Sequence, residues 1–249
     1  MGYREAYGYV NCWKCGKHSL PETLVALADI SVAQAKRLAS GIKVFGRRDL
    51  GDRSKGTLTL PSGLEKLSRR HKEYLRSRDF KPKQLIKLWK IQGIRHHPKL
   101  SWRIFIPCHF HAEIVTWTAR SIRPDHPLRY MSAPAEHEGR RRNEILYGED
   151  YIRHTIIICE GATDVWRIGP GAVATLGLSY SATQLERMAQ YNSRIVCFDS
   201  SSDAQRRANK LANDLMTLPG ETYNVQLDAE DPGSASKKEI NQLRKAFLD

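Results

Sequence analysis

The stretch TIIICEGATDVWRIGPGAVATLG, residues 155–177, decides the fold of the carboxyl-terminal part of the chain. An unbroken apolar run at 155–159 comes first, a segment with helical character follows, and a second apolar run occupies 172–177. Strands of continuous apolar residues that alternate with helices are typical of a parallel sheet covered by helices. The stretch therefore predicts an α/β fold.

The same alternation continues to the end of the chain. Two further apolar runs lie at 194–198 and 223–228. Segments with helical character accompany them, at 181–192, 203–218 and 236–249. We therefore predict one α/β domain over residues 154–249, with a parallel sheet flanked by helices.

The residues before this domain predict three further parts. Residues 1–39 are expected to form a small turn-rich module that ends in one helix over Pro21–Ala39. Residues 40–63 carry Gly, Pro and charge with little periodicity, which is typical of a linker. Residues 64–153 predict a basic mixed α+β subdomain.

Two features define the expected content of that subdomain. Its first part, 64–91, has helical periodicity and predicts two short helices broken near Phe80–Pro82. The later segments WRIFIPCHF and AEIVTWTARSI are rich in β-branched and aromatic residues. They predict a pair of strands that turns at His109–Ala112.

Charge is unevenly distributed along the chain, whose net charge is +13. Residues 1–153 hold 30 basic and 15 acidic residues, whereas residues 154–249 hold 10 and 12. Between Lys66 and Lys99 there are 12 basic residues and two acidic ones. Such clustering favours a polyanion as partner, nucleic acid above all. Three tryptophans lie among these charges and could stack bases, although core packing is their more common use: Trp89, Trp102 and Trp117.

Several classes of protein are disfavoured by composition. No apolar run approaches the length of about 18 residues that a membrane span needs, and the first 20 residues lack the apolar core of a signal peptide. The five cysteines are scattered and odd in number, unlike a disulfide framework. We expect a cytoplasmic protein with no membrane partner.

Acidic residues follow three of the predicted strands. Glu160 follows the first, Asp199 and Asp203 follow the third, and Asp228 and Asp231 follow the fourth. A single carboxylate at such a place is more often the cap of the next helix. Carboxylates from three strand ends at one edge of a sheet would instead suit Mg²⁺ or Mn²⁺.

These motifs resemble the TOPRIM domain, which DNA primases share with topoisomerases, repair proteins and some nucleases. Glu160-Gly161 resembles the glutamate motif of that family, and Asp199 resembles the first aspartate of its D-x-D motif. Asp203 opens a segment similar to the helix start written D-x-A-G-R in primases, and Glu230-Asp231-Pro232 resembles their G-E-D-P signature.

The upstream residues resemble primases in particular. RIFIPCHFHAEIVTWTARSI is similar to the strand pair of the primase core and places Arg120 at a basic position. Arg129 begins a segment similar to K-Y-L-N-S-P, and Arg142 precedes Leu146-Tyr147-Gly148 as in K-G-x-x-L-Y-G. HKEYLRSRDFKP resembles the start of the polymerase core, with Asp79 where Gly is usual.

The beginning of the chain resembles half of a zinc ribbon. Cys12 and Cys15 in YVNCWKCGKHSL match one ligand pair, and His18 could be a third ligand. A structural zinc needs four ligands. Either the ribbon is a degenerate remnant that binds Zn²⁺ weakly, or the reading frame begins late.

Two acidic positions of the family pattern are changed. Without a gap, the second aspartate of D-x-D falls on Ser201, and the aspartate after the proline falls on Gly233. The resemblance nevertheless implies that Glu160, Arg120, Arg129 and Arg142 act in catalysis. It further implies that Glu160, Asp199, Asp203, Asp228 and Asp231 hold Mg²⁺ or Mn²⁺.

The resulting hypothesis is a DNA primase that makes short RNA primers on single-stranded DNA from ribonucleoside triphosphates, in phage replication within the host cytoplasm. Since no G-x-x-x-x-G-K-[ST] motif occurs, a replicative helicase is expected on a separate chain. Two alternatives stay open: a TOPRIM protein of recombination or repair that binds DNA without synthesis, and a TOPRIM nuclease.

Overall fold

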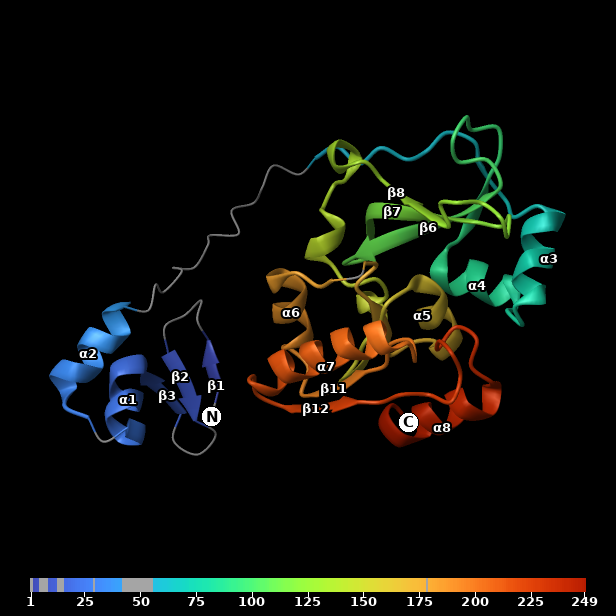
Figure 1. Cartoon of the computed structure of the whole chain (residues 1–249). Coiled ribbons are helices and arrows are strands. Elements are labelled where there is room, and N and C mark those ends of the chain that lie inside the picture. The colour runs from blue at the N-terminus through green and yellow to red at the C-terminus, as the bar shows by residue number, and fades with distance from the viewer. Residues whose placement is uncertain (1, 5–8, 13–15, 29, 42–55, 178) are drawn as a thin grey trace.

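The structure of the protein is a computed structural model (Figure 1). It describes residues 2–4, 9–12, 16–28, 30–41, 56–177 and 179–249. Before residue 56, side chains are described at 10, 18–28 and 30–36.

The amino-terminal module combines a small sheet with two helices. Strands β1 (Gly2–Arg4), β2 (Tyr9–Cys12) and β3 (Gly16–Ser19) pair antiparallel in that order. Helices α1 (Leu20–Ala28) and α2 (Val32–Gly41) follow.

The prediction of one helix over Pro21–Ala39 is wrong, because a second helix begins within it. The backbone N–H of Ser31 donates to Gln34 Oε1 at 3.0 Å, and the N–H of Gln34 donates to Ser31 Oγ at 3.3 Å. This reciprocal pair is a capping box, which satisfies backbone donors at a helix start. The sequence carried that signal as Ser-x-x-Gln.

The basic subdomain is built on a five-stranded antiparallel sheet in the order β4-β5-β6-β7-β8. Its strands are β4 (Leu64–Glu65), β5 (Gln92–Ile94), β6 (Arg103–Phe110), β7 (Glu113–Ser121) and β8 (Tyr130–Ser132). The two predicted helices are confirmed as α3 (Arg69–Ser77) and α4 (Pro82–Trp89). Short 3-10 turns at Ala135–His137, Arg142–Glu144 and Glu149–Tyr151 lead out of the subdomain.

The strand pair β6–β7 is confirmed, with a tight turn at His111 and Ala112. Both residues adopt positive φ, 53° and 65°. The carboxylate of Asp150 accepts their backbone N–H groups at 3.0 and 2.8 Å. The side chain therefore fixes a turn that lacks the glycine usually found in this conformation.

The end of the predicted linker lies against this sheet. The N–H of Thr59 donates to the carbonyl of His137 at 3.1 Å, and the indole of Trp117 donates to the carbonyl of Thr59 at 2.9 Å. A Cβ on Gly56 would lie 2.3 Å from the carbonyl oxygen of Glu138. Residues 56–63 thus belong to the subdomain, and the rest of the linker, 42–55, lies outside the described residues.

The carboxyl-terminal domain confirms the predicted α/β fold. Its four strands are all parallel, in the order β10-β9-β11-β12. They are β9 (Thr155–Cys159), β10 (Ala172–Ala174), β11 (Ser193–Val196) and β12 (Glu221–Asn224). The helices that cover them are α5 (Ala162–Ile168), α6 (Ala182–Met188), α7 (Ser202–Met216) and α8 (Lys237–Phe247).

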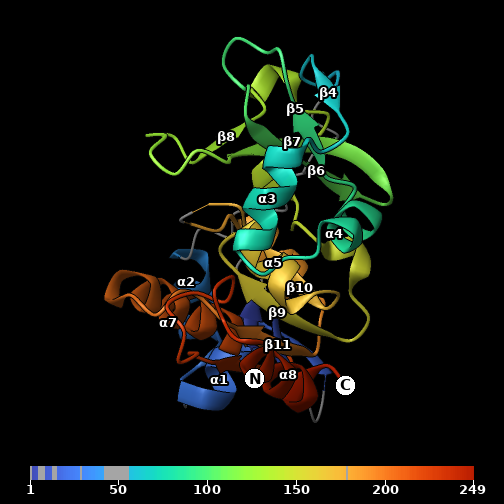
Figure 2. The same cartoon turned by 90° about the vertical axis from the view of Figure 1, so that its right-hand side faces the viewer.

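The two sheets share one hydrophobic core, with α5 between them in both views (Figures 1 and 2). Ile104 and Ile106 of β6 belong to the same buried cluster as Ile157 of β9 and Trp166 of α5. Burying this apolar surface from both sides makes the two units one folding body.

Cysteines serve this core as small apolar residues. Cys108, Cys159 and Cys197 are free and buried. Burial raises the pKa of Cys108 and of Cys197 to about 12, so both thiols stay protonated. Within the described part of the chain, no helix has the length and apolar character that crossing a membrane requires.

The turn of the β6–β7 pair yields a first prediction. Replacing Ala112 by glycine is expected to raise the free energy of unfolding by about 1 kcal/mol, because glycine adopts positive φ without steric cost. Urea unfolding followed by circular dichroism measures the change. The same substitution at Ala246, in helix α8, should lower stability, and a loss at Ala112 would contradict the proposed strain.

Candidate active site

A hollow of about 280 Å³ lies where the basic subdomain meets the carboxyl ends of the parallel strands. Carboxylates line one side of it and arginines line the other. We name it the acidic hollow, and its charged lining residues are Glu160, Asp164, Asp199, Asp231, Arg78, Arg120 and Arg129.

Topology brings three of the predicted acids together. Glu160 directly follows β9, Asp199 follows β11 after two residues, and these strands are parallel neighbours. Asp231 comes from the loop between β12 and α8. Parallel strands end at the same edge of a sheet, which is where open α/β folds bind ligands.

Glu160 has a partner that the sequence did not disclose. Arg207 of α7 donates from Nη2 to Glu160 Oε1 at 2.8 Å. The glutamate is mostly shielded, with 16% of its side chain exposed. One cation therefore already balances this carboxylate.

Asp164 is a fourth acid of the hollow, which the sequence analysis left outside the candidate residues. It lies in the first turn of α5 and is buried. Its carboxylate accepts the N–H of Gly161 at 2.9 Å and that of Gly233 at 3.2 Å. Burial, reinforced by the charge of Asp199, raises its pKa to about 7. The signal was its position four residues after Glu160.

The pKa of Asp199 is raised as well. Burial, followed by the charges of Glu160 and Asp231, raises the pKa of Asp199 to about 6. A carboxyl with this pKa is only part ionised in mildly acidic solution. Burial and the mutual repulsion of these acids therefore oppose their ionisation at this edge of the hollow.

The donor set fits a hard divalent cation such as Mg²⁺ or Mn²⁺. The carboxylates crowd around a glycine: a Cβ on Gly233 would lie 2.8 Å from Asp164 Oδ1 and 3.0 Å from Asp231 Oδ1. Among the described residues, no three His, Cys, Asp or Glu side chains are gathered closely enough to ligate one ion. Asp199 and Asp231 are the residues that would hold the ion, since Arg207 engages Glu160.

Arg120 is held rigidly on the opposite side of the hollow. It is buried on β7, donates from Nε to Tyr74 Oη at 2.7 Å, and donates from Nη1 to the hydroxyl of Tyr130. Its guanidinium carbon also lies 4.9 Å from the centre of the Tyr130 ring. Two tyrosines from different elements therefore fix its orientation.

Arg129 is exposed, but its backbone is anchored from behind. The buried guanidinium of Arg103 donates to the carbonyls of Leu128 at 2.7 Å and Arg129 at 3.2 Å. The exposed side chain of Arg129 thus extends from a backbone that Arg103 holds, and it can pair with an anion.

Three predicted site residues do not line the acidic hollow. Asp203 forms an exposed ion pair with Arg206 in the first turn of α7. Asp228 is exposed, and its N–H donates to Glu239 Oε1 at 2.6 Å. Arg142 lies in a 3-10 turn, where its N–H donates to Glu138 Oε1 at 3.3 Å.

The predicted zinc ligands are not tested by the structure. Cys12 is the last residue of β2, and its side chain is not described. Cys15 lies outside the described residues.

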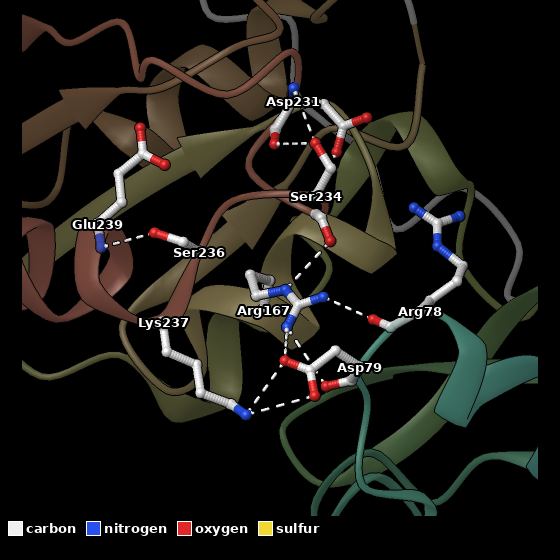
Figure 3. Close-up of polar contacts among 9 residues, drawn as sticks. Arg78, Asp79, Arg167, Asp231, Ser234, Ser236, Lys237 and Glu239 are labelled. Atoms are coloured by element: carbon white, nitrogen blue, oxygen red, sulfur yellow. Dashed lines mark hydrogen bonds and ion pairs between the residues drawn. The ribbon is translucent and has the colours of Figure 1, made fainter.

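Arg167 of α5 connects the two sides of the hollow (Figure 3). It donates to the carbonyl of Arg78 at 2.6 Å and to that of Gly233 at 3.1 Å. Its guanidinium also stacks on Phe80, 4.5 Å from the ring centre. Arg78 and Asp231 both line the hollow, so this one side chain sets their backbones relative to each other.

Asp79 strengthens that connection from the basic subdomain. It adopts a positive φ of 55°, which explains why glycine is usual at this position of the resembling motif. Its carboxylate lies 3.1 Å from Lys237 Nζ and 3.6 Å from Arg167 Nη1 (Figure 3). The side chain of Asp79 therefore connects the turn after α3 to α5, through Arg167, and to α8, through Lys237.

No protein-family model matches the sequence, and no curated protein matches it either. The fold, in contrast, is that of primase catalytic domains, and several solved structures have it.

The zinc-binding and RNA polymerase domains of the Aquifex aeolicus primase match with a TM-score of 0.62 and 17% identity, over 96% of this chain and 72% of that chain. The DnaG primase catalytic domain bound to single-stranded DNA matches with a TM-score of 0.59 and 17% identity, over 72% and 70%. The primase fragment of the bacteriophage T7 primase-helicase matches with a TM-score of 0.50 and 13% identity, over 96% and 90%.

The raised pKa values predict how pH controls ion binding. A proton on Asp199 or Asp164 must leave before an ion can bind beside it, so Mn²⁺ affinity is expected to rise from about pH 5 to about pH 8 and then to level off. Isothermal titration calorimetry measures this. Asp199→Asn should weaken binding at every pH, whereas Asp203→Asn should leave it unchanged; equal losses would place Asp203 at the ion.

The junction predicts a graded effect on stability. Arg167→Met is expected to lower the free energy of unfolding by about 3 kcal/mol, because it leaves two half-buried carbonyls without their donor. Asp79→Asn should lower it far less, since its ion pair with Lys237 is exposed to water. Denaturant unfolding of both variants measures the difference. Equal losses of unfolding free energy would contradict the conclusion that Arg167 holds the two sides of the hollow together.

Proposed function

We propose that the protein is a DNA primase, which synthesises short RNA primers on a single-stranded DNA template. The reaction joins the 3′-hydroxyl of one nucleotide to the α-phosphate of the next, with loss of pyrophosphate and of the hydroxyl proton. Such chemistry depends on positioning and on the neutralisation of phosphate charge. The observation that carries the proposal is the acidic hollow, which carboxylates at a strand edge and arginines of the basic subdomain line together.

The two sides of the hollow support different parts of this reaction. Arg120 and Arg129 would bind the triphosphate, with Arg120 oriented by Tyr74 and Tyr130 before the substrate arrives. Asp199 and Asp231 would hold Mg²⁺ or Mn²⁺, which supplies positive charge to the reacting phosphate when bound. Arg142, outside the hollow, is assigned to template phosphate.

Glu160 has two possible parts to play. It would accept the proton of the attacking hydroxyl, or it would complete the ion site after release from Arg207. Its contact with Arg207 argues against the second, because that arginine would have to release Glu160 before the carboxylate could bind an ion.

The likeness to a primase structure bound to single-stranded DNA supports that nucleic acid as the template. Ribonucleoside triphosphates would be the substrates. A helicase on another chain, and Zn²⁺ at Cys12 and Cys15, stay predictions.

One observation favours a second function, the binding of single-stranded DNA without synthesis. Ser201 and Gly233 stand where the resembling family has carboxylates, and Arg207 occupies Glu160. A hollow with fewer free acids would bind divalent ions more weakly.

Primer synthesis on single-stranded DNA with labelled ribonucleotides and Mg²⁺ or Mn²⁺ separates these functions. We expect ion-dependent products, and a loss of about a hundredfold or more in Glu160→Gln, which removes a charge but keeps the shape. Glu144→Gln, in a 3-10 turn outside the hollow, is the control and should retain activity.

Absence of products from the wild-type protein, with DNA binding intact, would establish the non-catalytic alternative. Shortened DNA formed with Mn²⁺ in the absence of nucleotides would establish a nuclease.

A further inference from the structure

The three tryptophans of the basic subdomain have different surroundings. Trp89 and Trp117 are 3% and 4% exposed and belong to the core. Trp102 is half-buried and lines a second hollow, of about 500 Å³, between the start of α3 and the connection from β5 to β6. We name it the Trp102 hollow. It does not share a lining residue with the acidic hollow.

Cations surround the ring of Trp102. The guanidinium carbon of Arg70 lies 4.8 Å from the ring centre and that of Arg123 lies 5.8 Å from it. Within the described residues, neither arginine forms an ion pair with a carboxylate, whereas the neighbouring Arg69 pairs with Glu73. Two positive charges therefore remain available to an anion beside an aromatic face.

The backbone fixes where the ring points. Trp102 adopts a positive φ of 63°, which is strained for a bulky side chain. Hydrogen bonds on both sides hold it there: its N–H donates to Ile94 at 3.2 Å, and its carbonyl accepts from Ile122 at 3.0 Å. Strain that the fold maintains at a half-buried position is characteristic of functional sites.

One face of α3 leads from this hollow to the acidic hollow. Arg70 and Tyr74 are spaced by four residues and lie on one face of α3, and Arg78, four residues further on, is the cap that ends the helix. Arg70 contacts Trp102, Tyr74 accepts from Arg120, and Arg78 lines the acidic hollow. These three residues offer a strand two cations separated by an aromatic ring.

We propose that the Trp102 hollow binds the single-stranded DNA template, with one base stacked on Trp102 and the flanking phosphates on Arg70 and Arg123. A base on the ring displaces a guanidinium, which then pairs with the adjoining phosphate. Every base has a face that can stack, so the site is tolerant of sequence, and it needs an unpaired base. The inference rests on the proposed use of a DNA template.

Fluorescence anisotropy with labelled oligo(dT) tests the proposal. Neither ribonucleoside triphosphates nor Mg²⁺ or Mn²⁺ are added, so that only template binding is measured. Trp102→Ala and Arg70→Ala are each expected to weaken binding about tenfold, and Trp102→Phe less. Arg76→Ala is the matched control, because it removes the same charge from the same helix at a position two residues, or about half a turn, away from Tyr74. It should change affinity far less.

Circular dichroism melting checks that each variant folds, and Trp102→Phe keeps the test valid if the alanine variant does not. Wild-type affinity in folded Trp102→Ala would overturn the proposal, as would equal losses in Arg70→Ala and Arg76→Ala. A duplex bound with the same dependence on Trp102 would overturn base stacking.

Failure of the proposed function is distinguishable from failure of this inference. Loss of affinity in Trp102→Ala together with no primer synthesis by the wild-type protein supports the site and refutes catalysis. Primer synthesis by a Trp102→Ala protein that binds oligo(dT) like the wild type supports catalysis and refutes the site.

Discussion

The geometry of the acidic hollow depends on the hydrogen bonds that the guanidinium of Arg167 donates. This guanidinium is nearly buried, so its donors must be satisfied by protein, and the carbonyls that satisfy them belong to Arg78 on one side and Gly233 on the other. Any shift of the basic subdomain against the parallel sheet would leave those groups unpaired. The shared apolar core resists the same shift, but it is not directional. Arg167 therefore fixes the position of Arg78 relative to Asp231, which apolar burial alone cannot specify.

Electrostatics in the hollow are governed by repulsion among acids that the fold forces together. The ends of β9 and β11 bring Glu160 and Asp199 to one edge, and the fold raises the pKa of Asp199 and Asp164 instead of separating them. Arg207 neutralises Glu160 without reaching the others by a hydrogen bond or ion pair. Acids that oppose one another's ionisation in this way favour a bound cation, and a cation would in turn attract an anionic substrate.

Much of this could be predicted from the sequence, because it follows from periodicity and topology. Continuous apolar strands gave the parallel sheet, and its parallel order placed Glu160 and Asp199 together without knowledge of side chains. Contacts between distant segments could not be predicted in this way. Arg207 and Arg167 are two of many arginines in the sequence, and only the packing of α7 and α5 selects them. The surroundings of Asp203 could not be predicted either: it follows a strand end in the sequence, and its side chain pairs with Arg206 at the surface.

Gly233 illustrates why a departure from a family pattern needs the structure to be interpreted. As a sequence change, it is a lost carboxylate. In the fold, its N–H donates to Asp164, and any Cβ there would press against both Asp164 and Asp231. An aspartate at 233 would also add negative charge beside two carboxyl groups whose surroundings are already crowded. The glycine therefore leaves both carboxyl groups where they are, whereas an aspartate at 233 would require them to shift. The change removes one acid from the loop while a buried one is kept at the floor of the hollow, so the acidic character of the site is retained with a different distribution of charge.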